Sequence, residues 1–92
     1  MYKSTVSVRA YHFMKNKMGY TFPFSPAECE YAATHIVLGF SPHVAGLTTA
    51  VELYRAAGYG VWQIWYLVND KMDFSRVKKL CEKFDKELHQ AL

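Results

Sequence analysis

The chain has 92 residues, of which 51% are hydrophobic and 16% aromatic, and a formal net charge of +3. This composition excludes an intrinsically disordered chain, the small net charge does not by itself indicate nucleic-acid binding, and no run approaches the roughly 18 apolar residues of a membrane span. We therefore expect one domain over residues 1–92 with one modest core, located in the cytoplasm because no signal-like apolar segment opens the chain.

The segment 4–18 is compatible with two structures. Read as a helix, it carries one apolar stripe, formed by Val6, Ala10, Phe13, Met14 and Met18. Read as a strand over 5–13, it alternates apolar and polar residues and would pair with 20–24. We favour the helix because the stripe runs the length of the segment and Gly19 supplies a stop signal.

The next helix has a clear start and a clear end. Ser25 is a good N-cap, Pro26 suits the first helical position, and Glu28 completes a capping box. Gly39 is expected to end this helix, because glycine readily adopts the left-handed conformation found there.

A further helix start follows directly at Ser41-Pro42 and predicts a helix that runs to Ala57, with Gly58 just beyond its end. Its buried stripe would consist of Val44, Leu47, Val51 and Tyr54. Because the junction between the two helices is very short, they should form a tight corner or hairpin.

Residues 61–68 contain seven apolar or aromatic residues in eight, including both tryptophans, and turn-forming residues enclose them. A buried strand is compatible with this run, but the preceding glycine-rich turn favours a short helix. On so short a helix, Trp62, Trp65 and Tyr66 cannot all face inward, so part of this aromatic surface should be exposed.

The spacing around this segment resembles the helix-turn-helix pattern, carried by Leu53, Ala57, Gly58, Tyr59, Ile64 and Leu67. Two departures weigh against DNA reading. Tyr54 is bulky where a small residue is usual, and the second helix would carry no arginine, lysine or asparagine for base edges. A purely structural corner is the favoured interpretation, followed by a protein-binding corner and then a DNA-reading one.

The last helix should begin at Asp73, an N-cap residue, with Met72 positioned to pack on Val77. Its apolar face is formed by Val77, Leu80, Cys81, Phe84, Leu88 and Ala91. On another side lies a basic ridge, which we define as Arg76, Lys79, Lys83 and Lys86. Such a ridge can follow a phosphate backbone or an acidic groove, although interspersed acidic residues also fit an ordinary solvated face.

Signs of catalytic or metal chemistry are few. None of the histidines has a metal-type spacing: His12, His35, His43 and His89. Cys29 and Cys81 fall on apolar helix faces, where we expect free buried thiols. Glu28, Tyr31 and His35 share a helix face, which we interpret as a surface contact and not as an acid–base pair. With no phosphate loop or nucleophile elbow either, we expect neither an enzyme nor a cofactor or metal site.

Together these elements predict an all-α bundle of about five short helices with a helix-turn-helix-like corner. The alternative is an α+β fold with a small three-stranded antiparallel sheet, whose strands would lie near 5–13, 20–24 and 61–68.

The expected function is that of a small non-catalytic interaction protein that binds, and in the inhibitory case blocks, a larger protein or nucleoprotein complex. Docking would use Trp62, Gln63, Trp65 and Tyr66, aided by the basic ridge, and Trp62→Ala or Trp65→Ala would remove binding with little change in melting temperature. Small domains of this kind are common among phage and mobile-element accessory proteins, including anti-defence inhibitors. A helix-turn-helix-like nucleic-acid-binding regulator is the alternative, and a homodimer that hides the aromatic residues is compatible with either.

Overall fold

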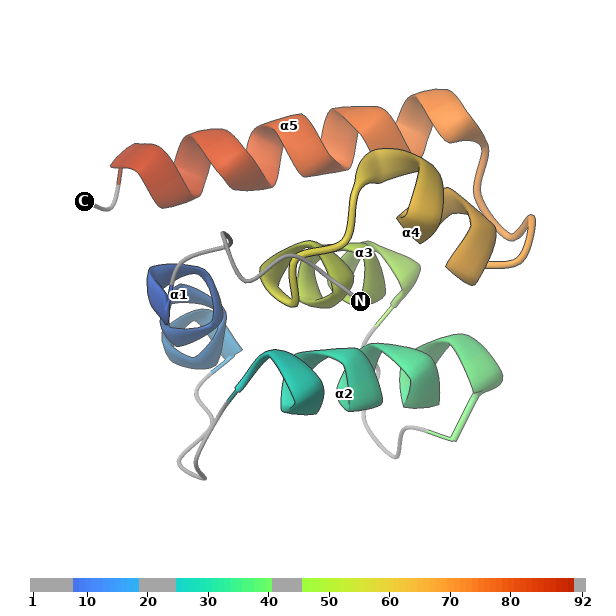
Figure 1. The fold of residues 1–92 in the computed structure, drawn as a ribbon. Coiled ribbons are helices and arrows are strands. Elements are labelled where there is room, and N and C mark those ends of the chain that lie inside the picture. Colours follow the sequence, from blue (N-terminus) through green and yellow to red (C-terminus); the bar gives the residue numbers. More distant parts are fainter. Residues whose placement is uncertain (1–7, 19–24, 41–45, 91–92) are drawn as a thin grey trace.

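The computed structural model describes residues 8–18, 25–40 and 46–90. Within them it contains no strand and five helices (Figure 1): α1 (Val8–Met18), α2 (Pro26–Leu38), α3 (Leu47–Ala56), α4 (Val61–Leu67) and α5 (Phe74–Gln90). The predicted all-α bundle is confirmed. The α+β alternative is wrong, because residues 61–67 and the described part of 5–13 are helical, while 20–24 lies outside the described residues.

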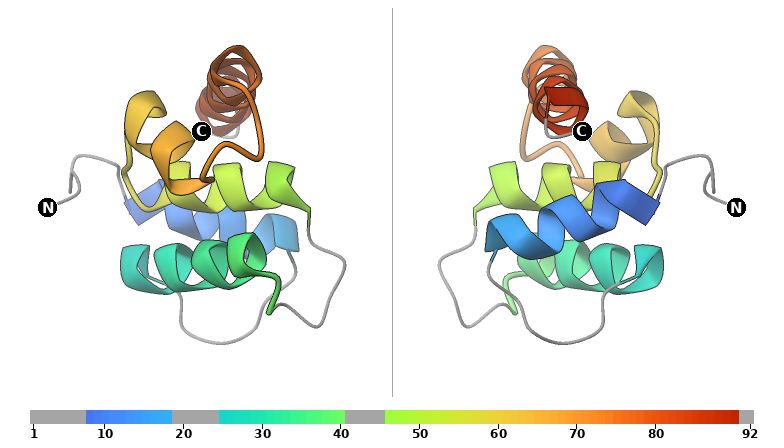
Figure 2. Two further views of the ribbon diagram at one scale, coloured as in Figure 1. Left: turned by 90° about the vertical axis from the view of Figure 1, so that its right-hand side faces the viewer. Right: turned by 90° about the vertical axis from the view of Figure 1, so that its left-hand side faces the viewer.

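Helix α3 is the centre of the bundle. Figure 2 shows it between α2 on one side and α5 on the other, and α1 and α4 also contact it. From Ala50 to Ala56 every residue except Arg55 is buried. A helix surrounded on all sides has no free polar face, and the one buried charged residue, Glu52, accepts a hydrogen bond of 2.7 Å from the Lys17 ammonium of α1.

Two ion-pair networks connect the outer helices to α3. Lys17 pairs with Glu52 and, at 3.3 Å, with Glu87 of α5. Burial acts to lower the pKa of Lys17, but the hydrogen bonds and charges of the two carboxylates outweigh it and raise that pKa. Arg55 donates two hydrogen bonds to the Asp85 carboxylate, at 3.0 and 2.8 Å, and a third to the Tyr59 carbonyl. The Arg55 guanidinium therefore joins α3, the start of the α3–α4 turn and α5.

The ends of α2 and the start of α5 agree with the capping signals in the sequence. The Ser25 hydroxyl accepts a hydrogen bond from the Glu28 amide, and Gly39 has a φ of 82°. The amides of Gly39 and Phe40 donate to carbonyls of the last turn, which is a Schellman motif. At α5, the Asp73 carboxylate accepts a hydrogen bond of 2.9 Å from the Arg76 amide.

The predicted start of the third helix is wrong. Helix α3 begins at Leu47, and Gly46 before it is extended, with a φ of −83° and a ψ of −179°. Glycine has a low helix propensity and is acceptable at an N-cap, so Gly46 marks the boundary and not Ser41-Pro42, which lies outside the described residues. Among the described residues, no helix combines the length and apolar character needed to cross a membrane.

Candidate functional site

The corner that was predicted from the sequence is present between α3 and α4. Leu53, Ala57 and Ile64 are buried in it, and Gly58 has a φ of 104°, a conformation that side chains rarely adopt. Tyr54, bulky for this pattern, is accommodated because its ring packs edge-on against Tyr59 and its hydroxyl reaches across to α2.

Helix α4 is held in place from several sides. Ile64 and, just after the helix, Val68 are completely buried. At the first turn, the Gln63 side-chain oxygen accepts a hydrogen bond of 2.8 Å from the Gly60 backbone amide. This is one of the two hydrogen bonds of a capping box, and the other needs a side chain that Gly60 lacks. Gln63 was predicted to contact a partner, and the structure places its amide group at the helix cap. The capping role of Gln63 could have been predicted from the sequence, because Gln63 stands three residues after the N-cap Gly60.

The aromatic side chains of α4 are largely on the surface. Trp62 is 67% exposed and Tyr66 is 80% exposed, whereas Trp65 is half-buried. The Trp62 ring stacks on Phe74 of α5, with centroids 4.1 Å apart, and Trp65 meets both rings edge-on. We refer to Trp62, Trp65 and Tyr66 as the aromatic patch. The expectation that part of this surface is exposed is confirmed, and Trp65 is its inner, supporting member.

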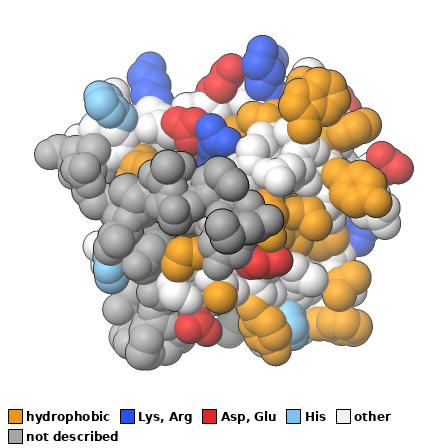
Figure 3. Space-filling view, viewed as in Figure 1, with side chains coloured by type: hydrophobic (Ala, Val, Ile, Leu, Met, Phe, Trp, Pro, Cys, Tyr) orange, Lys and Arg blue, Asp and Glu red, His pale blue; other side chains and the backbone are white. Residues whose placement is uncertain are grey.

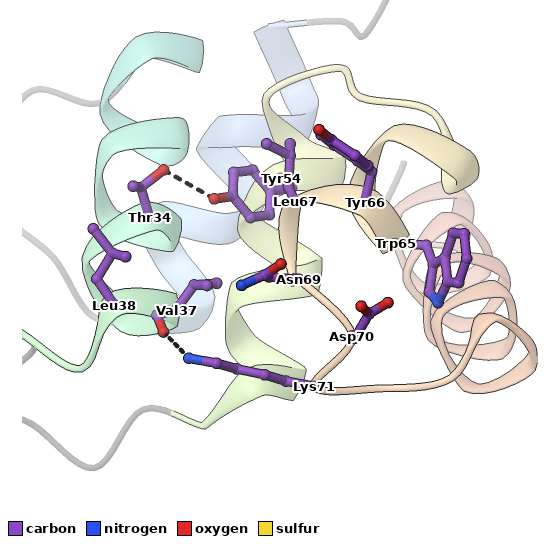
Figure 4. A pocket seen from close by; sticks show the side chains of 10 residues that line it. All are labelled: Thr34, Val37, Leu38, Tyr54, Trp65, Tyr66, Leu67, Asn69, Asp70 and Lys71. Atoms are coloured by element: carbon purple, nitrogen blue, oxygen red, sulfur yellow. Dashed lines mark hydrogen bonds between the residues drawn. The ribbon is translucent and has the colours of Figure 1, made fainter.

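A hollow of about 480 Å³ lies beside the aromatic patch, between the last turns of α2 and the turn that joins α4 to α5 (Figure 4). The Tyr54 ring lies at its base, and the Tyr54 and Thr34 hydroxyls are 2.9 Å apart. Burial raises the pKa of the Tyr54 hydroxyl, and the charge of Glu30 raises it further against the effect of Thr34. Lys71 closes one end by donating a hydrogen bond to the Val37 carbonyl.

Apolar side chains are also exposed on α2 and just after its end. Leu38, Phe40 and Tyr31 are 59%, 69% and 67% exposed. The Tyr31 and His35 rings lie with centroids 4.2 Å apart. In Figure 3, hydrophobic side chains gather on one side of the molecule, over α4 and the end of α2. Sequence reasoning missed the α2 part of this surface, although Tyr31 and Leu38 are seven positions apart, two helical turns, and lie off the buried stripe.

The basic ridge of α5 faces another direction. Arg76, Lys79, Lys83 and Lys86 are all exposed, as expected. At 3.6 residues per turn, the ridge lies roughly 160° around α5 from Phe74, the residue that contacts the aromatic patch. The ridge and the aromatic patch therefore do not form one continuous face, and a partner would have to wrap around α5 to engage both.

Both cysteines are buried, and the His35 ring makes a contact within its own helix. Burial raises the pKa of the Cys29 thiol to about 12 and that of Cys81 to about 11, so both thiols remain protonated near neutral pH. The His35 ring lies 3.1 Å from the Tyr31 carbonyl within α2, a local helix contact. Among the residues that the structure describes, no three histidine, cysteine or acidic side chains come together as metal ligands.

Compared with known proteins, the chain matches no family model, no curated protein and no solved structure. Function is therefore inferred from the geometry.

Proposed function

We propose that the protein is a non-catalytic interaction module that docks on a larger protein or nucleoprotein complex through the aromatic patch of α4. The observation that carries this proposal is the exposure of Trp62 and Tyr66, at 67% and 80%, on one short helix. Tryptophan and tyrosine bury a large area with few rotatable bonds, and for this reason they dominate interface hot spots.

The way in which α4 is anchored adds to this support. Ile64 and Val68 fix the helix to the core, Gln63 caps its first turn, and Arg55 holds the Tyr59 carbonyl in the preceding turn. The Trp62 ring also rests on Phe74. A docking surface that is ordered before binding loses little conformational entropy when a partner arrives. A module without catalytic groups acts by occupying a surface of its partner, so inhibition by occlusion is the effect we propose.

The test is affinity capture from the native host with four immobilised proteins: the wild type, Tyr66→Ala, Trp62→Ala, and the control Glu82→Gln, which alters an exposed residue of α5 outside both the aromatic patch and the basic ridge. A partner of the aromatic patch should be recovered with the wild type and the control and lost with Tyr66→Ala. A partner that is retained by Tyr66→Ala and Trp62→Ala alike would refute docking through this patch.

The exposed basic ridge favours a second candidate function, contact with a nucleic-acid backbone. Helix α4 carries no cationic residue, and the oxygen of Gln63, its one amide side chain, already accepts a hydrogen bond from the Gly60 amide, which disfavours base reading by the corner. Phosphate contacts by the ridge would be independent of sequence and steeply dependent on salt. Binding of labelled duplex at low salt that is lost in Lys79→Glu/Lys83→Glu would support this candidate, and salt-independent binding would contradict it.

A further inference from the structure

We infer that the segment of the partner that docks here inserts an apolar side chain into the hollow between α2 and the α4–α5 turn and places a lysine or arginine beside Asp70. This inference rests on the proposed function. The hollow would receive the partner, and the partner's segment would carry an apolar residue next to a cation.

The shape of the site supports an inserted side chain. The hollow has a volume of about 480 Å³ and reaches down to the buried Tyr54 ring, so it is deeper than a flat patch. Two exposed apolar side chains from helices far apart in the chain flank it, Leu38 of α2 and Tyr66 of α4. Val37 and Leu67 add apolar lining between them. An apolar side chain seated here would lose water contact on several sides, which is the main source of binding free energy.

The charges at the site select a cation next to that side chain. Of the two charged residues that line the hollow, Lys71 is engaged with the Val37 carbonyl at the negative end of α2. Asp70 is exposed and has no hydrogen-bond or ion-pair partner among the described residues. Glu30 adds negative potential, since its charge acts on the Tyr54 hydroxyl. Although Lys71 keeps its positive charge, its ammonium is held at the Val37 carbonyl, so the carboxylate of Asp70 stays open to a lysine or arginine of the partner.

Aromatic rings beside Asp70 strengthen this selection. Trp65 and Tyr66 line the same hollow, and in Figure 4 the Asp70 carboxylate lies on the side of the turn nearer Trp65, while Asn69 points towards Tyr54. A cation beside Asp70 would meet a carboxylate and the face or edge of an aromatic ring. Ring faces attract cations, and arginine favours this combination of a planar ion pair with ring stacking.

The backbone of the turn suits the residues found at positions 69 and 70. Asn69 and Asp70 have φ values of 54° and 64°, in the left-handed region that asparagine and aspartate tolerate best among residues other than glycine. Asp70→Asn therefore keeps both the shape and the backbone preference of the turn and removes only the charge. This makes it a matched variant for the test.

The test selects binders from a displayed library of short random peptides, with the immobilised full chain as bait. The selected peptides are synthesised and titrated by fluorescence anisotropy against the wild type, Asp70→Asn, Leu38→Ser, Tyr66→Ser and the control Glu82→Gln, an exposed residue outside the hollow, the aromatic patch and the basic ridge. We expect the peptides to share a large apolar residue close to a lysine or arginine. Asp70→Asn should weaken them about ten-fold without a change in melting temperature, since a charge-assisted contact is lost. Replacing the peptide's cation by a neutral residue should abolish the difference between wild type and Asp70→Asn.

Peptides without a cation, or with equal affinity for the wild type and Asp70→Asn, would overturn the inference. If Tyr66→Ser still abolished their binding, the proposed docking function would stand without it. Failure to select any peptide, or binding that neither Tyr66→Ser nor Leu38→Ser weakens, would overturn both. Concentration-dependent dimerisation that Leu38→Ser removes would assign the hollow to a second copy of the chain and would also overturn the inference.

Discussion

Alanine substitutions at two positions of α4 separate its anchoring face from its exposed face. Ile64 is completely buried, and Tyr66, two positions later, is 80% exposed. Deleting a buried isoleucine side chain to alanine costs about 2–5 kcal/mol of unfolding free energy. For Tyr66, the buried fifth of roughly 200 Å² is about 40 Å², which at about 25 cal/mol per Å² amounts to about 1 kcal/mol. The higher helix propensity of alanine offsets roughly half of that.

Thermal and urea unfolding, followed by far-ultraviolet circular dichroism, measure both variants. In a domain of this size, 1 kcal/mol shifts the melting temperature by roughly 4–8 °C, so Ile64→Ala should lower it by about 10 °C or more and Tyr66→Ala by about 5 °C or less. Equal destabilisation by the two substitutions would show that the Tyr66 ring is buried and would refute the docking surface.

Three further predictions concern the supports of the site. Gly58→Ala should lower the unfolding free energy by about 1–3 kcal/mol, because a φ of 104° is strained for alanine; a neutral result in urea unfolding would contradict the corner geometry. Asp85→Asn should cost about 1 kcal/mol, a modest value because its side chain is 46% exposed, and a double-mutant cycle with Arg55→Met should show coupling between the two. Burial raises the pKa of both thiols, so as pH rises above 9.0, their ordinary pKa, the unfolded chain ionises first and the unfolding free energy should fall. Cys29→Ala should reduce this fall with pH, measured by urea unfolding at a series of pH values. Rapid reaction of a thiol reagent with native Cys29 or Cys81 near neutral pH would contradict their burial.

The role of Trp65 differs from the expectation based on the sequence. Because its ring is half-buried and packs edge-on against Trp62 and Phe74, Trp65→Ala should destabilise the fold as well as weaken docking. Trp62→Ala, which removes a more exposed ring, should lower the melting temperature less. Comparison of the two variants by thermal unfolding checks this order, and the reverse order would contradict the burial of Trp65.

Much of the fold was predictable because local signals and packing agree. Ser25, Gly39 and Asp73 mark helix ends through their own hydrogen bonds or backbone conformation, and these interactions involve only neighbouring residues. Helix α4 was identified from a turn and from apolar spacing. The start of α3 was missed because a serine–proline signal was weighed above Gly46.

The exposed aromatic surface was predictable for a geometric reason, since a helix as short as α4 cannot turn three large rings towards one core. The hollow beside it was not predictable. It brings together Thr34 and Lys71, which are far apart in the chain, and their distance depends on how α2 and α4 each pack against α3. The sequence also does not show on which side of α5 the short helix α4 packs, and therefore does not reveal that the basic ridge faces away from the aromatic patch.

Both tryptophans of the chain lie in the aromatic patch, so tryptophan fluorescence reports on this surface and on no other part of the protein. The most direct test is acrylamide quenching of that fluorescence, measured for the free protein and for the protein saturated with its captured partner, after subtraction of the partner's own signal. Docking through the patch predicts strong quenching in the free protein and a clear loss of quenching in the complex. Equal quenching in both states would show that the partner leaves the indole rings in water and would contradict the account.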